Sequence, residues 1–308
     1  MKLPLALAIA LLSGGLGLAR ADDTACAQRE GVSVQILGSG GPVADDARAS
    51  TGNLIWRDGK SVALIDAGGG IFLRFGEARA RIEDLDFVAL THFHTDHSAD
   101  FPALVKSAFF IERNRNLPVF GPSSNAIFPG LNGFLNGMLG PKKGVYRYLS
   151  GFLDGKGQEF SLEPTEVDAR KATATQVFSK GDVRVQAVGV PHGRVPSVGY
   201  AIEVGPYKMV FSGDQNTQDP RLARIAMNAD LLVFPLALPE EAGPGARQLH
   251  AVPSQIADFA TATHARKLVL THLMAASLSA LDESLAIIRQ RYSGPVVVAQ
   301  DLMCLPLD

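Results

Sequence analysis

Short apolar runs bounded by glycine, proline and polar residues alternate along the chain with stretches of helical periodicity. The apolar runs predict strands at residues 32–37, 53–56, 61–65, 87–90, 183–190, 198–204, 208–212, 231–234, 267–271 and 295–299. Helices are predicted at about residues 70–82, 98–110, 253–263 and 279–292. This succession predicts an α/β protein whose sheet layers are covered by helices.

The segment at about residues 121–175 follows a different pattern, with frequent glycine and proline, recurrent aromatic residues and weak periodicity. Long irregular segments in compact domains often carry function. The pattern is therefore consistent with a variable substrate-facing segment, and equally with an ordinary, partly helical surface excursion.

Residues 1–21 have the layout of a cleavable signal peptide, because Lys2 precedes an apolar stretch at 3–12 and small residues flank Arg20. The apolar stretch is too short for a comfortable membrane span, and no later segment is apolar enough to be one. We therefore expect a periplasmic or secreted protein with a signal peptide at 1–21 and a single domain at 22–308. A hydrophobic content of 46% suffices for one large core.

The formal net charge is −2, and loss of Lys2 and Arg20 with the signal peptide would make it −4. A net-negative protein without a cluster of lysines and arginines is a poor candidate for polyanion binding. We therefore expect no nucleic-acid partner.

The two cysteines, Cys26 and Cys304, lie near opposite ends of the expected mature chain. In an oxidising compartment such a pair favours a disulfide that ties the termini together. The alternative is two unpaired thiols, because sequence does not supply the required geometry.

Four potential metal ligands occur within residues 91–97, directly after a predicted strand: His92, His94, Asp96 and His97. Imidazoles and a carboxylate crowded at a strand end repel or desolvate one another unless a cation lies among them. Neutral imidazole and carboxylate oxygen are ligands that zinc prefers at hydrolytic sites. This spacing predicts a metal site, and one loop of this kind can serve two adjacent ions.

Three further polar residues, His192, Asp214 and His272, also follow predicted apolar strands. Five of the seven histidines thus stand at strand ends, where sites of layered α/β folds are built. We expect these side chains to converge.

The chain resembles the metallo-β-lactamase superfamily and, within it, exported members of the ribonuclease Z-like or arylsulfatase-like branch. The resemblance covers nearly all of the mature chain and is carried by Gly38-Ser39-Gly40, Asp66-Ala67-Gly68-Gly69, Thr91-His92-Phe93-His94-Thr95-Asp96-His97, His192, Ser212-Gly213-Asp214 and Leu270-Thr271-His272. It implies a four-layer αβ/βα sandwich and, from the habits of the branch alone, a homodimer.

The resemblance further implies two Zn²⁺ ions per chain, with manganese and iron as alternatives. One ion would bind His92, His94 and His192. The other would bind Asp96, His97 and His272, and Asp214 would bridge both. A metal-bridging hydroxide would then attack the substrate, and Asp96 would orient it or take its proton. Asp66 would support a ligand histidine, and the alternative for it is a turn-forming residue before the glycines.

His250 resembles the branch's proton donor to the leaving group, although Val252 replaces a threonine and Pro235 replaces the acidic residue that orients that donor. Glu240 and Glu241 are candidate substitutes. The alternative for His250 is a capping or surface role. His264 is expected to be solvated, whereas Arg194 and Ser197 beyond His192 would bind an anionic substrate group or face water.

These observations favour an exported dinuclear zinc hydrolase of a small-molecule ester, either a phosphodiester or an arylsulfate ester. The alternatives are a lactonase or β-lactamase-type acyl hydrolase and a non-catalytic periplasmic metal-binding protein. Processing of tRNA, the branch's best-known activity, fits poorly with export and with a net negative charge.

Overall fold

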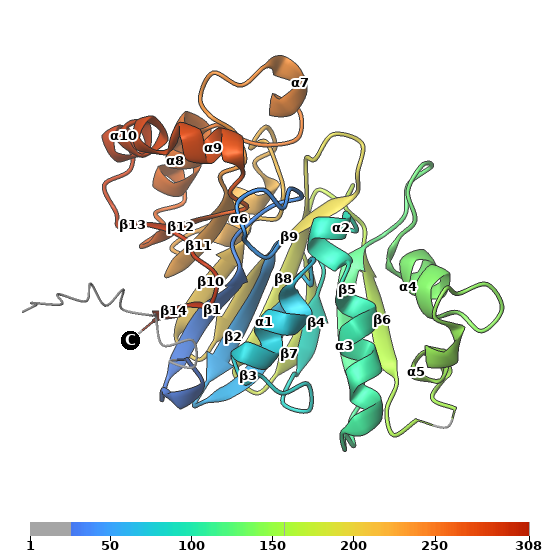
Figure 1. Ribbon diagram of the computed structural model, residues 1–308. Helices are drawn as coiled ribbons and strands as arrows, with labels where there is room; N and C mark the ends of the chain where they lie inside the picture. The colour runs from blue at the N-terminus through green and yellow to red at the C-terminus, as the bar shows by residue number, and fades with distance from the viewer. Residues whose placement is uncertain (1–25, 157, 308) are drawn as a thin grey trace, which may run out of the picture.

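The computed structural model describes residues 26–156 and 158–307 and contains two seven-stranded sheets packed face to face (Figure 1). The first sheet contains β1 (Val32–Gly38), β2 (Gly52–Arg57), β3 (Lys60–Ile65), β4 (Phe87–Ala89), β5 (Leu117–Pro122), β6 (Leu162–Val167) and β14 (Met303–Pro306). The second contains β7 (Thr175–Lys180), β8 (Val183–Val190), β9 (Ser197–Val204), β10 (Tyr207–Phe211), β11 (Leu231–Pro235), β12 (Leu268–Thr271) and β13 (Val296–Val298). Their orders are β14-β1-β2-β3-β4-β5-β6 and β13-β12-β11-β10-β9-β8-β7.

Helices cover the outer face of each sheet (Figure 1). The first sheet is covered by α1 (Ile71–Glu77), α3 (Phe101–Ser107), α4 (Leu131–Leu139) and α5 (Gly151–Asp154). The second is covered by α6 (Arg221–Ala226), α8 (Pro253–Ala262) and α10 (Leu281–Arg291). The short helices α2 (Thr95–Ser98), α7 (Pro244–Arg247) and α9 (Ala275–Ser279) lie in connections.

Three apolar clusters separate these layers. The central cluster packs side chains of the two sheets against each other, among them Ile36, Phe87 and Tyr200. The outer clusters lie between each sheet and its helices, around Leu64 and Phe101 on one side and Leu232 and Ile256 on the other. The predicted four-layer αβ/βα sandwich is therefore confirmed.

The direction of the strands explains where the polar residues gather. β3 pairs in parallel with β4, and β10, β11 and β12 pair in parallel with one another. Because the carboxyl ends of parallel strands meet at the same edge of a sheet, the residues that follow β3, β4, β10 and β12 reach one side of the molecule. The face-to-face packing of the sheets then brings the two edges together.

The segment at 121–175 is more regular than its sequence pattern suggests. It contains α4, α5 and β6, and β6 pairs with β5 over six residues, from Leu117↔Leu162 to Pro122↔Val167. Prolines in both strands and the exposed middle of β6 hide this pairing in the sequence. The helix predicted at 98–110 begins instead at Phe101, with Pro102 in its first turn, and the first predicted helix ends at Glu77 rather than near residue 82.

Cys26 and Cys304 form a disulfide with a Cα–Cα distance of 5.5 Å. The bond joins the short 3₁₀ helix at Cys26–Gln28 to β14, which is an edge strand of the first sheet. The predicted signal peptide at 1–21 lies outside the described residues. Within the described part of the chain, no helix has the length and apolar character needed to cross a bilayer.

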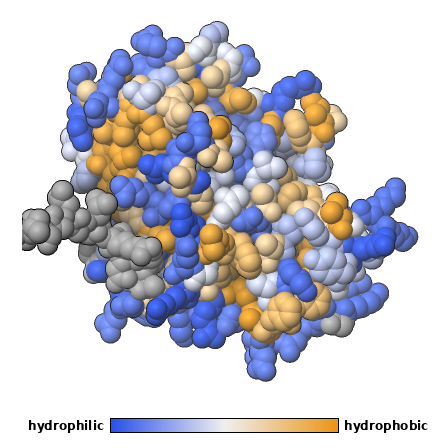
Figure 2. All heavy atoms as spheres, in the orientation of Figure 1, coloured by the Kyte–Doolittle hydropathy of each residue, from blue (hydrophilic) through white to orange (hydrophobic). Residues whose placement is uncertain are grey.

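Apolar side chains also gather on the surface over α1 and the lower end of α3 (Figure 2). Phe72, Leu73 and Phe110 are exposed there, and the Nζ of Lys106 lies 4.9 Å from the ring centroid of Phe110. A groove of about 740 Å³ runs between these helices. It shares no lining residue with the cavity that holds the histidine cluster.

Candidate metal centre

All seven predicted ligands lie together at the shared edge of the two sheets. They form two neighbouring groups of potential ligand atoms: His92, His94 and His192, and Asp96, His97, Asp214 and His272. Six of the seven side chains are buried and His94 is half-buried. Five of them, His94, Asp96, His192, Asp214 and His272, line a cavity of about 480 Å³ together with Pro42, Phe93, Thr95, Leu249 and His250.

In the first group, His92 Nε2 lies 3.0 Å from His94 Nδ1, and His192 Nε2 lies 3.4 Å from the same atom. His92 and His94 come from the loop between β4 and α2, and His192 follows β8. A tetrahedral ion with bonds of about 2.1 Å holds its donors roughly 3.4 Å apart. The spacing of the three nitrogens therefore fits one such ion.

In the second group, His272 Nε2 lies 3.1 Å from Asp96 Oδ2 and 3.3 Å from Asp214 Oδ2. His97 Nε2 lies 3.5 Å from each of the same two oxygens. These spacings also fit a tetrahedral ion of that bond length.

Asp214 stands between the two groups. Its Oδ2 belongs to the second group and lies 3.9 Å from both His92 Nε2 and His192 Nε2 of the first. One carboxylate oxygen therefore reaches ligand atoms of both groups, which is the arrangement that a bridging ligand requires.

Hydrogen bonds behind the cluster set the direction of three imidazoles. The Thr91 hydroxyl donates to Asp66 Oδ2 at 2.9 Å, so it accepts from His92 Nδ1 at 3.1 Å. Asp66 Oδ2 also accepts from His97 Nδ1 at 2.9 Å. The carbonyl oxygen of Leu249 accepts from His192 Nδ1 at 2.9 Å. Each Nδ1 thus carries the proton, and each Nε2 presents a lone pair to the cluster.

The loop after β1 supports His272 from the other side. A Cβ built on Gly41 would lie 2.7 Å from His272 Cε1, so only glycine fits against this ring. Asp301 holds the two ends of the loop together, because its carboxylate accepts from the backbone N–H of Ser39 at 3.0 Å and of Ala49 at 2.8 Å. Sequence reasoning did not identify Asp301, since the two N–H donors lie more than 250 residues away along the chain.

The buried carboxylate of Asp214 gives the cluster a negative charge that a cation would neutralise. Burial alone would raise the pKa of Asp214, but His272 and His97 hold it well below its usual value. Burial opposes the charged form of His272, but Asp214 more than offsets this and raises its pKa to about 9. Burial also lowers the pKa of His92 well below its usual value. Asp214 therefore remains charged and attracts cations to the cluster.

Several buried atoms of the cluster have no hydrogen-bond partner in the described residues: His97 Nε2, Asp214 Oδ1 and His272 Nδ1. Unpaired buried polar atoms are costly, and a metal ion would satisfy the ligand atom His97 Nε2. All donors are nitrogen or carboxylate oxygen, without a thiolate, which suits zinc, manganese or iron. The residues present fit a pair of divalent ions.

His250 lies at the edge of the cluster, with its Nδ1 3.9 Å from Asp214 Oδ2 and its side chain 12% exposed. Burial lowers the pKa of His250 to about 4. With His192 and Asp214 it also forms a third group of potential ligand atoms. Its Nδ1 has no hydrogen-bond partner in the described residues.

Neither candidate acid orients His250. The Glu240 carboxylate accepts from the backbone N–H of Ser254 at 2.9 Å and from its hydroxyl at 2.6 Å, so it caps the start of α8. Glu241 is exposed, and within the described residues it forms no hydrogen bond or ion pair with His250. The idea that Glu240 replaces the orienting acid is therefore wrong.

The remaining sequence candidates lie outside the cluster. Arg194 is exposed and Ser197 is buried, with its hydroxyl donating to the Asp214 carbonyl at 3.4 Å. His264 is exposed just beyond α8, as expected. Each is therefore separate from the two groups of ligand atoms.

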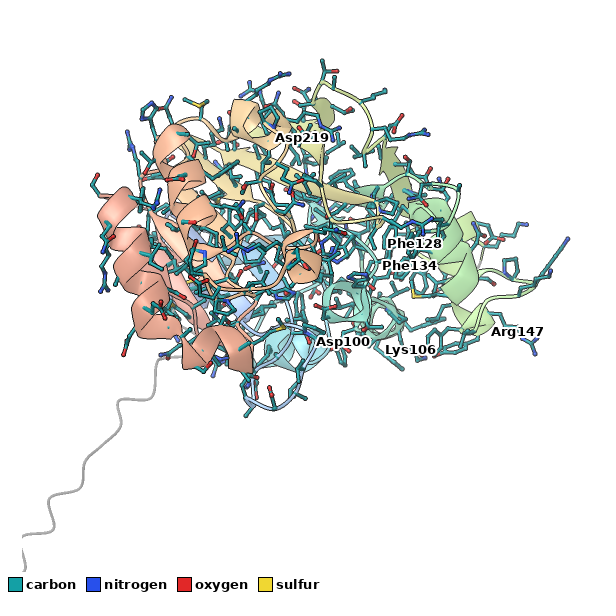
Figure 3. The ribbon with its side chains drawn as sticks, turned by 90° about the horizontal axis from the view of Figure 1, so that it is seen from above. Asp100, Lys106, Phe128, Phe134, Arg147 and Asp219 are labelled. Atoms are coloured by element: carbon teal, nitrogen blue, oxygen red, sulfur yellow. A yellow bond between two sulfur atoms is a disulfide. The ribbon has the colours of Figure 1, made fainter. Side chains whose placement is uncertain are left out.

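An aromatic contact ties α4 to the histidine motif. The rings of Phe93 and Phe134 are stacked, with centroids 4.5 Å apart and an interplanar angle of 13°. Phe134 projects from α4 toward the centre of the molecule, beside Phe128 (Figure 3). Phe93 also lines the cavity of the cluster, so α4 supports one of its apolar walls. The sequence pattern left a substrate-facing segment and an ordinary surface excursion equally open, and it did not indicate which residue makes this contact.

Comparisons with known proteins agree with this architecture. Residues 140–273 match the family model described as a beta-lactamase superfamily domain. The chain is 25% identical over 289 residues to Ribonuclease Z from Mycobacterium avium (strain 104), which covers 90% of this chain and 99% of the relative.

Among solved structures, the short form of human tRNase Z has a TM-score of 0.68 at 19% identity, covering 90% of this chain and 99% of that chain. The Zn²⁺-bound PqqB from Methylobacterium extorquens has a TM-score of 0.63 at 16% identity, covering 89% and 99%. The predicted resemblance is confirmed, with ribonuclease Z-like homologues over most of the chain.

Proposed function

Because the chain belongs to the metallo-β-lactamase superfamily and is a ribonuclease Z-like, metal-dependent hydrolase, we propose that it is exported and hydrolyses small-molecule esters. The proposed substrates are phosphodiesters or arylsulfate esters. The proposal is supported chiefly by one observation, the position of Asp214 Oδ2 within 3.9 Å of nitrogen atoms from both groups of histidines.

In this proposal, His92, His94 and His192 hold one ion, and Asp96, His97 and His272 hold the other. Asp214 would serve both ions, because its Oδ2 lies within 3.9 Å of nitrogens of both groups. Such a pair would supply a water nucleophile that ionises at a pKa of about 7 and positive charge that stabilises the transition state. Zinc is the proposed metal, because the donors are imidazole and carboxylate.

The residues around the ions would position the reactants. Asp66, Thr91 and the Leu249 carbonyl keep the imidazoles in the tautomer that binds metal. Asp96 would orient the attacking water, because its Oδ2 lies at the cluster and its side chain is 7% exposed. His250, at the edge of the same cavity, is the proposed proton donor to the leaving group. Because burial lowers its pKa to about 4, it would have to gain that proton together with the bound anionic substrate.

A small substrate is favoured over an RNA by three features. The cavity has a volume of about 480 Å³, and Pro42, Phe93 and Leu249 give it apolar walls. The chain carries a formal net charge of −2. The predicted signal peptide would place the protein in the periplasm or outside the cell, away from tRNA precursors. Assembly as a homodimer is part of the proposal by resemblance alone.

The proposal is tested with metal-analysed mature protein and a panel of p-nitrophenyl esters. Bis-p-nitrophenyl phosphate or p-nitrophenyl sulfate should be cleaved by zinc-loaded protein, and Asp214→Ala should abolish the cleavage. Cleavage of lactones or β-lactams alone would show an acyl hydrolase instead. Stoichiometric metal without turnover on any substrate would show a metal-binding protein.

A further inference from the structure

A second, smaller crevice adjoins the metal cavity. It has a volume of about 190 Å³, and His192 lines both this crevice and that cavity. Three connections line it: the loop after β5, the loop after β6 and the loop between β8 and β9. The lining residues are Ser123, Ser124, Asn125, Ala169, Arg170, Val190, Pro191, His192, Gly193, Arg194, Val195, Pro196 and Ser197.

The charges at this crevice have one sign. Two arginines line it, Arg170 and Arg194, and no acidic side chain does. Arg194 forms no ion pair with any residue in the described part of the chain. Arg170 donates from Nε to Asp168 Oδ1 at 3.1 Å. That pair is exposed and therefore weak, so it does not prevent Arg170 from binding a ligand.

The walls of the crevice are held by hydrogen bonds that do not use its own cations. Asn125 Nδ2 donates to the Arg194 carbonyl at 2.8 Å, which joins two of the three connections. Arg221 Nη1 donates to the carbonyls of Ala169 and Lys171, both at 2.8 Å, and fixes the turn that carries Arg170. The same turn packs against β8 so closely that a Cβ on Gly189 would lie 1.8 Å from the Ala169 oxygen. The crevice is therefore formed before any ligand binds.

We propose that this crevice binds a second anionic group of the substrate, a phosphate, sulfate or carboxylate, while the scissile ester lies in the metal cavity. Arginines bind such groups with charge-assisted hydrogen bonds, and the Ser123 and Ser124 hydroxyls add further donors. The inference rests on the proposed function, because it assigns this group to the substrate of the same site. It narrows the substrate class to esters that carry a second negative charge beyond the scissile bond.

The first test measures anion binding without metal. The full mature chain is stripped with EDTA and titrated calorimetrically with inorganic phosphate, sulfate or acetate at constant ionic strength. At least one anion should bind saturably, and Arg194→Gln should weaken its binding about tenfold or more, whereas Arg194→Lys should retain part of it. Arg289→Gln, at an exposed arginine of α10, is the matched control and should bind as wild type does.

The second test uses zinc-loaded protein and two phosphodiesters, methyl 4-nitrophenyl phosphate and 2-carboxyethyl 4-nitrophenyl phosphate. The carboxylate should lower KM about tenfold in wild type and in Arg289→Gln, and this advantage should disappear in Arg194→Gln. Equal KM values for the two esters in wild type would overturn the inference and leave the proposed function intact. If neither ester is cleaved, the phosphodiesterase proposal fails, and the titration still decides the subsite. Anion binding in the titration that is equal in wild type and Arg194→Gln, or absent in both, would overturn the inference of an anion subsite.

Discussion

Asp66 Oδ2 accepts a hydrogen bond from His97 Nδ1 at 2.9 Å, and both side chains are almost completely buried. The same carboxylate accepts from the backbone N–H and the hydroxyl of Thr91 at 2.7 and 2.9 Å. The Asp66 carboxylate thus accepts three hydrogen bonds and donates none. Its left-handed backbone, with φ of 61°, further indicates a position that the surrounding structure imposes.

Asp66→Asn should therefore weaken metal binding although asparagine has nearly the size of aspartate and none of the seven proposed ligands is removed. The amide nitrogen of asparagine would face Thr91 Oγ1 and His97 Nδ1, and His97 would move its proton to Nε2, which removes the lone pair that faces the cluster. Loss of such a partner typically costs 10–100-fold in metal affinity. Competition with a chromogenic chelator measures this affinity. Asp258→Asn, at an exposed carboxylate of α8, is the control, and equal affinity in both variants would contradict the role of Asp66.

Gly41→Ala should release one of the two ions. The new Cβ would lie 2.7 Å from His272 Cε1 and 2.8 Å from His272 Nδ1, so the ring must move away from Asp96 and Asp214. The group around His92 has no contact with this ring and should keep its ion. Elemental analysis after dialysis should then show about one ion per chain in place of two.

Gly76→Ala is the matched control for this substitution. Gly76 is exposed in α1, has an ordinary φ, and a Cβ there would meet no atom within 4 Å. The helix should tolerate or gain from the alanine. Two ions per chain in Gly41→Ala would show that His272 can shift without leaving its metal.

Cys304→Ser should lower the free energy of unfolding and leave the metal content unchanged. The disulfide closes a loop between residues 278 positions apart, for which the chain-entropy model gives an upper value of about 5.6 kcal/mol. β14 would then be held by its pairing with β1 and by the packing of Leu305 in the central cluster. Denaturant unfolding of wild type, Cys304→Ser and Cys26→Ser measures the difference. The two variants should agree, and a loss confined to one of them would point to packing rather than to the cross-link.

The sequence predicted the strands that lead into the cluster because each is an apolar run followed by a turn. It did not predict β5, β6, β7 or β14, because proline, exposed polar residues or a length of four residues weakens each pattern. Asp66 was recognisable as a supporting residue from its motif. The Leu249 carbonyl was not, because a backbone atom carries no residue identity. Phe134 and Asp301 act through contacts that only the tertiary structure creates.

His250→Ala should separate the formation of the nucleophile from the protonation of the leaving group. His250 lies at the edge of the cavity, and a general acid contributes about 10²–10⁴-fold when the leaving group is a poor one. In His250→Ala, kcat should therefore fall far more for an ester with an alkyl leaving group than for a p-nitrophenyl ester, because p-nitrophenolate departs as an anion without assistance. His264→Ala, at the exposed histidine beyond α8, should change neither rate and serves as the control. His250 is also a potential ligand with His192 and Asp214, so metal content is measured in parallel. An equal loss on both leaving groups together with a fall in bound metal would assign His250 to metal binding and remove it from proton transfer.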